Sequence, residues 1–154
     1  MTTYETALKD LLKAIPEFDA DESLDAGESL RDPTLPFLGY GAFAGFLKRR
    51  YLDRGVDAVL RKSFGFLEGL ATSGPELENL VEVGVLESIG DLDRGQDNRT
   101  AMSALLRISG PRTAYLFRRI EAFWTGTLEE FQGLPPDVDT RSQWPPAQGN
   151  PSLD

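Results

Sequence analysis

Apolar side chains recur every three to four residues along most of this chain, and proline or glycine interrupts the repeat at intervals. This spacing places apolar side chains on one face of a helix. It occurs at residues 3–15, 36–52, 56–71, 75–90, 99–108 and 111–131. No segment shows a convincing two-residue alternation, so we expect no substantial sheet. The sequence therefore predicts an all-α fold: a single domain of about six helices, in an irregular helical bundle or a short stack of helical pairs.

The joints between these segments carry the residues that end and begin helices. Ser-Gly-Pro occurs at residues 73–75 and again at 109–111. Glycine suits the position just after a helix, and proline suits the first position of the next one. Pro16 ends the first helix, because the residue before a proline avoids helical dihedral angles. Residues 17–34 are acidic and weakly apolar, and we expect a long connection with room for a short helix.

Gly41 and Gly45 lie four residues apart in the second predicted helix. This spacing predicts close approach of another helix there.

In the last predicted helix one face carries Phe117, Ile120, Trp124, Leu128 and Phe131, which predicts that this face is buried. Gly126 is the position at which that helix can kink or end early.

The chain's 154 residues suit one domain. Five of its ten prolines fall in residues 133–154. We therefore predict a helical domain at 1–132 and an extended, Pro-rich tail at 133–154. The longest uncharged apolar stretch, residues 35–47, is shorter than the roughly 20 residues that cross a bilayer. The first ten residues lack the pattern of a signal peptide, so we expect a cytoplasmic protein without membrane contact.

Composition removes several kinds of chemistry. The chain has no cysteine and no histidine. It therefore lacks disulfides, thiolate ligands and the commonest general base, and it fits a reducing compartment. The glycines of residues 39–45 resemble half of a dinucleotide-binding motif but follow a helical pattern instead of a strand. We expect no cofactor and no enzymatic activity.

Asp91, Asp93 and Asp97 resemble part of a calcium-binding loop. That loop needs a glycine at position six and an acid at position twelve, where this chain has Gly95 at position five and Met102 at twelve. The loop therefore suits helix-capping acids better than a cation, and we expect no metal site.

The formal net charge is −9, which disfavours nucleic acid and anionic membranes as partners. Acidic and basic blocks alternate along the chain, and residues 99–119 carry five arginines and no acid. Glu78 and Glu82 lie four residues apart on one helix and have no base beside them in sequence. They face solvent, an arginine from the 99–119 block, or a partner.

Nine acidic residues in three stretches are the candidates for contact with a partner. They are Asp19, Asp21, Glu22, Asp25, Glu28, Glu78, Glu82, Asp91 and Asp93. None of them belongs to a recognisable catalytic motif, so the candidate site is a binding surface.

Four segments together carry a resemblance: "LPFLGYGAFAGFL", "FGFLEGL", "ENLVEVGVLESI" and "GPRTAYLF". In this order, over residues 35–124, the chain resembles small acidic all-helical bacterial proteins of poorly defined role. Some proteins of this build are immunity proteins, which neutralise a toxin delivered by a competing cell. The resemblance implies no catalytic residue.

An immunity role implies a protein partner, such as a cognate toxin. Many toxins that attack nucleic acid are basic, and an acidic binder is steered toward a basic partner. Two alternatives stay open. One is a helical structural or assembly module that self-associates; the other is a hydrolase that uses a pair of carboxylates.

Overall fold

The computed structural model describes residues 1–27, 29–94 and 99–132 of the chain. Within these ranges every regular element is a helix and none is a strand, which confirms the all-α prediction. Glu28 and the predicted tail at 133–154 lie outside the described residues. In the part of the chain that is described, no helix is long and apolar enough to cross a membrane.

The chain begins with short helices at one end of the molecule. They are α1 (Ala7–Ala14), α2 (Pro16–Asp19) and the 3₁₀ helix η1 (Glu22–Asp25). The first helix begins later than the predicted residue 3. Before it, the backbone N–H groups of Thr3 and Thr6 donate to each other's hydroxyl oxygens at 2.9 and 3.2 Å. Pro16 ends α1 as predicted and also opens α2.

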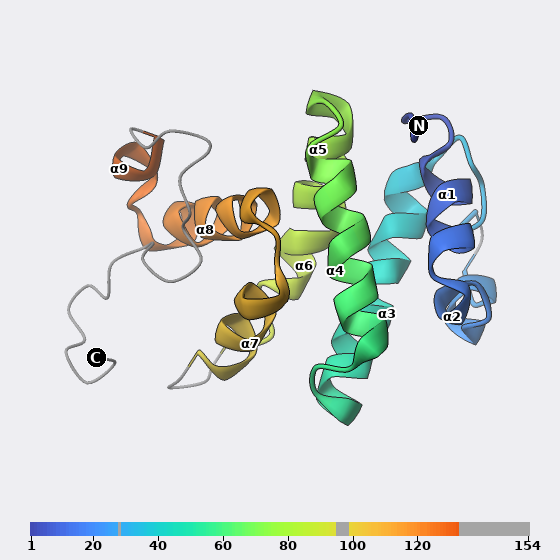
Figure 1. The fold of residues 1–154 in the computed structure, drawn as a ribbon, viewed down its shortest axis with the longest axis horizontal. Helices are drawn as coiled ribbons and strands as arrows, with labels where there is room; N and C mark the ends of the chain where they lie inside the picture. Colours follow the sequence, from blue (N-terminus) through green and yellow to red (C-terminus); the bar gives the residue numbers. More distant parts are fainter. Residues whose placement is uncertain (28, 95–98, 133–154) are drawn as a thin grey trace.

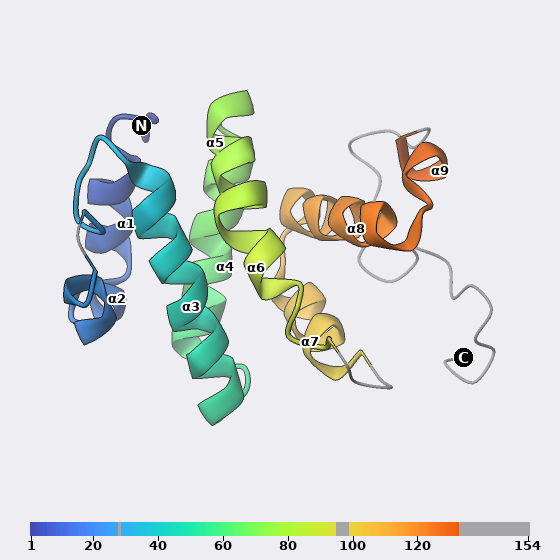
Figure 2. The ribbon, with the colours of Figure 1, turned by 180° about the vertical axis from the view of Figure 1, so that it is seen from behind.

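Long helices form the middle of the molecule. They are α3 (Pro36–Arg54), α4 (Ala58–Ala71) and a continuous helical run made of α5 (Pro75–Val81), η2 (Glu82–Leu86) and α6 (Glu87–Ile89). Pro36 and Pro75 open their helices, as predicted. Figures 1 and 2 show α3, α4 and this run side by side, with α1 beyond α3.

The segment η2 is a π turn within the predicted 75–90 helix. It ends with the N–H of Glu87 bound to the carbonyl of Glu82, five residues back. A π turn holds one residue more than an α-helical turn and shifts all later side chains around the axis. Gly84, Val85 and Leu86 are buried in succession, whereas Val83 is 44% exposed.

The C-terminal part consists of α7 (Thr100–Ile108), α8 (Pro111–Thr125) and α9 (Leu128–Gln132). In Figures 1 and 2, α8 runs crosswise to α4 and α5, at the opposite end of the array from α1 and α2. Gly126 adopts the left-handed conformation, with φ of 76°, and ends α8. The predicted 111–131 helix is therefore two helices, divided at the predicted glycine.

The hydrophobic core is continuous from α1 to α9. Tyr40 on α3 is fully buried, and its hydroxyl donates to the carbonyl of Ala7 at 2.7 Å. Close helix approach occurs at Gly39: a Cβ there would lie 2.5 Å from Cδ1 of Leu8. The prediction for Gly41 is wrong, because it faces away from the core and a Cβ there would meet nothing within 4 Å.

Candidate functional site

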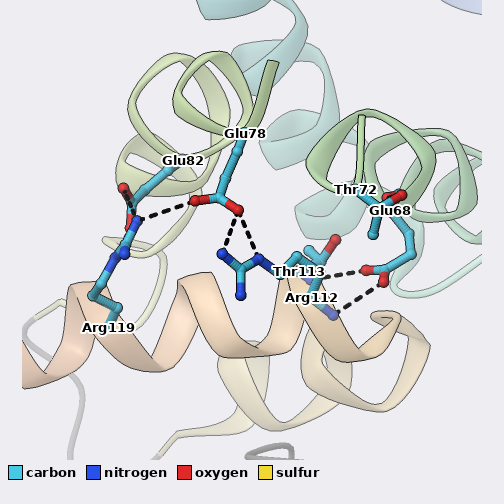
Figure 3. Close-up of polar contacts among 7 residues, drawn as sticks. All are labelled: Glu68, Thr72, Glu78, Glu82, Arg112, Thr113 and Arg119. Carbon is cyan, nitrogen blue, oxygen red and sulfur yellow. Dashed lines mark hydrogen bonds and ion pairs between the residues drawn. The ribbon is translucent and has the colours of Figure 1, made fainter. Parts of the chain in front are cut away.

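Glu78 and Glu82 face α8, where two arginines bind them (Figure 3). The Arg112 Nε donates to Glu78 Oε2 at 2.6 Å. Arg119 donates to both oxygens of Glu82, from Nε at 2.6 Å and from Nη2 at 2.7 Å. Arg119 also lies 3.8 Å from Glu78. Of the alternatives that the sequence left open, the structure therefore shows pairing with the 99–119 block.

This set of paired side chains, which we term the α8 ladder (Glu78, Glu82, Arg112 and Arg119), is partly withdrawn from solvent. The Glu78 and Glu82 side chains are 20% and 14% exposed. The guanidinium groups of Arg112 and Arg119 lie 4.8 and 5.8 Å from the ring centroid of Tyr115. Hydrogen bonding to Glu82 raises the pKa of Arg119, although burial opposes this. Binding of a partner by these two glutamates stays a prediction, and it requires displacement of the arginines.

A third glutamate, Glu68 on α4, holds the beginning of α8 (Figure 3). Its carboxylate accepts from the backbone N–H groups of Arg112 at 3.0 Å and Thr113 at 2.8 Å. These N–H groups have no partner inside the helix, and the helix dipole favours a negative charge there. Gly110 makes the approach possible, because a Cβ at this position would lie 2.3 Å from Cδ of Glu68. This role of Glu68 was not predicted from the sequence.

The acidic residues around α2 and η1 form a second group, which we term the α2–η1 face (Asp19, Asp21, Glu22 and Asp25). Arg31 donates to Asp19 at 2.7 Å and to Asp25 at 2.9 Å. Hydrogen bonds to both raise the pKa of Arg31.

Two further side chains complete this face. Asp21 accepts from the N–H of Ser23 at 2.9 Å and lies 3.5 Å from Arg49. Burial opposes ionisation of Asp21, but the hydrogen bonds from Ser23 and the charge of Arg49 outweigh it and lower its pKa. Glu22 is exposed, and no ion pair to it occurs among the described residues.

Asp91 and Asp93 have separate partners. Asp91 pairs with Lys48 of α3 at 2.9 Å. Asp93 accepts from the N–H groups of Ala101 at 3.1 Å and Met102 at 2.9 Å, and so caps α7. This agrees with the interpretation of the loop as one that carries helix-capping acids. No group of three or more possible ligands for a metal ion occurs in the described ranges.

Asp91 and Asp93 line a hollow of about 310 Å³, and Trp124 is also among its lining residues. Glu121 also lines it and accepts from Arg99 and from Arg118. Burial lowers the pKa of Arg118, although Glu121 opposes this. A carboxylate-based hydrolase would need two acids free in such a hollow. Because both oxygens of Asp93 are bound by α7, that alternative stays a prediction without support from this geometry.

Trp124 also lines a second hollow, which we term the α8–α9 groove. Its volume is about 440 Å³. The groove is lined by Glu82, Glu87, Arg119, Ile120, Phe123, Trp124, Leu128 and Gln132. Phe123 is 67% and Trp124 47% exposed, so the prediction that Trp124 belongs to a buried face is wrong.

The cause is the end of α8 at Gly126: Leu128 and Phe131 lie on the separate helix α9, so the single face predicted for residues 111–131 does not form. The sequence carries no local signal for this exposure, because adjacent apolar residues on the same helix, such as Leu116 and Phe117, are both fully buried.

The predicted binding residues thus fall in three places. Glu78 and Glu82 join the α8 ladder, and Glu82 also borders the groove. Asp91 and Asp93 line the other hollow that Trp124 borders, together with Glu121. The α2–η1 face lies apart from both, at the opposite end of the helical array (Figure 2). Glu28 lies outside the described residues.

The fold and these surfaces define an all-helical protein with candidate binding faces at both ends. The chain belongs to the family described as "Domain of unknown function (DUF7674)", whose family model matches residues 8–125. The match runs from α1 to the last turn of α8 and includes the α8 ladder. No curated protein matches the chain, and no solved structure matches it.

Proposed function

We propose that this chain is a non-enzymatic, protein-binding protein of the immunity type, which acts in the bacterial cytoplasm and neutralises a basic toxin by direct binding. The observation that carries the proposal is the charge of the α2–η1 face. Its four carboxylates have two guanidinium groups within reach, those of Arg31 and Arg49. The Asp19 and Asp25 side chains are 51% and 68% exposed, so the negative charge is open to a partner.

Excess negative charge on an exposed face attracts a basic protein over a distance of about one Debye length, roughly 8–10 Å at ordinary salt. It accelerates encounter more than it strengthens the final complex. Binding to this face should therefore weaken as salt is added.

The α2–η1 face is also fixed in shape before any partner arrives. Phe18 and Leu24 are buried beneath it. Arg31 donates to the carbonyl of Asp19 at 2.8 Å as well as to two carboxylates. A surface held in this way loses little conformational freedom on binding, and this favours affinity. The α8 ladder offers less, since its two carboxylates are balanced by two guanidinium groups and are only 20% and 14% exposed.

The test begins with affinity capture from the native bacterium at low and moderate salt. We expect one basic protein, captured less well as salt rises. Glu22→Lys breaks no ion pair or side-chain hydrogen bond among the described residues and should reduce capture. Adding Asp19→Lys and Asp25→Lys should abolish it. Asp53→Lys is the matched control, because Asp53 is an exposed acid on α3 whose only ion pair among the described residues is with its neighbour Arg54.

Neutralisation is measured by growth of a bacterium that produces the captured protein, with and without this chain. Rescue by the unaltered chain and by Asp53→Lys, but not by the triple variant, is the expected result. Circular dichroism checks that the triple variant is folded. If no basic partner is captured, or if the triple variant rescues growth equally well, the proposal is wrong.

A second candidate function, self-association as a structural or assembly module, is favoured by one observation: the exposure of Phe123 and Trp124 in the α8–α9 groove. Sedimentation of the chain over a range of concentrations tests it.

A further inference from the structure

We propose that the α8–α9 groove is a second docking surface, which takes an apolar or aromatic side chain from a segment of the partner that also carries Lys or Arg. This inference deepens the proposed function, on which it rests for the nature of the partner, a basic protein. It names a different surface and the chemistry that the surface recognises.

The groove has the layout of an interface centre. Phe123 and Trp124 are the most exposed apolar side chains of α8. Ile120, beside them in the groove, is 6% exposed. Binding energy in protein interfaces concentrates in aromatic side chains at the centre of a contact that excludes water. Two adjacent aromatic residues that remain exposed on a folded helix supply such a centre.

Trp124 is held in place before any partner binds. Its indole lies against Gly90, just after α6: a Cβ on Gly90 would be 3.2 Å from two ring carbons of Trp124. Trp124 lines both the groove and the neighbouring hollow. A side chain already packed against the protein loses less conformational freedom on binding than a fully mobile one does.

The rim of the groove selects for positive charge. Arg119 is the one base among the described residues that line it, and its Nε and Nη2 already donate to Glu82. Glu87, which lines the groove, is exposed. A Lys or Arg beside an apolar anchor would meet this carboxylate.

The same charges disfavour a second copy of this chain as the occupant. A two-fold contact repeats the same patch on both partners. It would bring Glu87 of one copy near Glu87 of the other, and like charges across an interface cost binding energy. Figures 1 and 2 show α8 and α9 at the far end of the array from α2, so a groove lined by residues of α8 and α9 is separate from the α2–η1 face.

The test uses the full chain labelled with 5-fluorotryptophan. The chain has two tryptophans, so the fluorine spectrum has two resonances, and Trp144→Phe assigns the one from Trp124. The probes are three synthetic peptides of equal length: an amphipathic peptide of Lys and Leu, a peptide of Lys and Ser, and a peptide of Glu and Leu. We expect the Lys/Leu peptide to shift the Trp124 resonance in a saturable manner and the other two to leave it unchanged.

Variants locate the binding. Phe123→Ala and Glu87→Lys should each weaken the Lys/Leu peptide about tenfold or more. Leu52→Ala and Asp53→Lys are matched controls, because Leu52 is 71% exposed and both residues lie near the end of α3, outside the groove. Their affinities should stay within about twofold of the unaltered chain.

Three results would overturn the inference. One is no saturable shift of Trp124 with the Lys/Leu peptide. Another is equal binding by the groove variants and the controls. The last is a dimer of the unaltered chain that Phe123→Ala dissociates, which would make a second copy the occupant. If the groove fails while reversal of the α2–η1 face still abolishes partner capture, this inference alone is wrong and the proposed function stands.

Discussion

Arg119 binds the carboxylate of Glu82 through two hydrogen bonds, of 2.6 and 2.7 Å, and so joins α8 to the π turn η2 between α5 and α6. Both groups are partly buried, with the glutamate 14% and the arginine 32% exposed. Removal of one partner of such an ion pair lowers the stability of the fold, because the other partner is left partly buried without its counter-charge.

Arg119→Ala should therefore destabilise the fold by about 2 kcal/mol. Removing the carboxylate as well, in Glu82→Gln with Arg119→Ala, should cost less than the sum of the single changes, with a coupling of about 1 kcal/mol. Urea unfolding followed by circular dichroism measures all three variants. Arg107→Ala, an exposed arginine on α7, is the control and should change stability by less than about 0.5 kcal/mol. Additive single changes would contradict the expected coupling.

Glu68→Ala should destabilise the chain by about 1–2 kcal/mol, because the N–H groups of Arg112 and Thr113 at the start of α8 lose their acceptor. Gly110→Ala should destabilise it too, since the new Cβ collides with the Glu68 carboxyl group. In the double variant the collision is absent, and the combined loss should be smaller than the sum. Thermal unfolding of the four proteins tests this. A combined loss equal to the sum would mean that Glu68 and Gly110 act separately.

Gly39→Ala and Gly41→Ala form a matched pair on one helix. A Cβ at Gly39 would lie 2.5 Å from Leu8 Cδ1 and 2.9 Å from the carbonyl oxygen of Leu30, so we expect a loss of about 1–3 kcal/mol. At Gly41 a Cβ meets nothing within 4 Å, and alanine should stabilise the helix by about 0.5–1 kcal/mol. The midpoint of urea unfolding should move in opposite directions. A shift in the same direction for both would contradict the packing described here.

Stability should depend on pH mainly in the acid range. Burial works against ionisation of Asp57, but hydrogen bonds from the Leu60 N–H and from Arg50, with the charges of Arg50 and Arg54, lower its pKa below the ordinary 3.8. A lowered pKa in the folded state gives stability that is fully present above the unfolded value and is lost as pH falls through the folded value.

Unfolding by urea should therefore become easier below about pH 4, and Asp57→Asn should show a smaller loss over that interval. Asparagine can still cap the N-terminus of α4, so the variant should remain folded. Between about pH 6 and 8 stability should be nearly flat, because the chain has no histidine. A marked change in that interval would contradict this expectation.

Helix positions followed from the sequence because the apolar period and the prolines act locally. Pro36, Pro75 and Pro111 each open a helix, as expected from proline's fixed φ and missing N–H. The pairing of Glu78 and Glu82 with the 99–119 block was among the predicted alternatives, because that block is rich in arginine. Which arginine binds which glutamate depends on the crossing of α8 over α5, and local patterns do not determine it.

Other features escaped prediction for related reasons. Gly39 rather than Gly41 meets α1, because helix contacts depend on the rotation of α3 about its own axis. Trp124 fits the apolar period of α8 but is exposed, because the chain turns at Gly126. The role of Glu68 could be predicted only from the position of α8, a helix that begins more than forty residues later along the chain.

The π turn limits how the length of this chain can change during evolution. One added residue in a helix rotates everything after it by about 100°. Deletion of a single residue between Glu82 and Leu86 would leave a continuous helix but would turn Gly90 out from beneath the ring of Trp124. Substitutions at exposed positions such as Val83 should therefore be accepted among relatives far more readily than insertions or deletions in this turn.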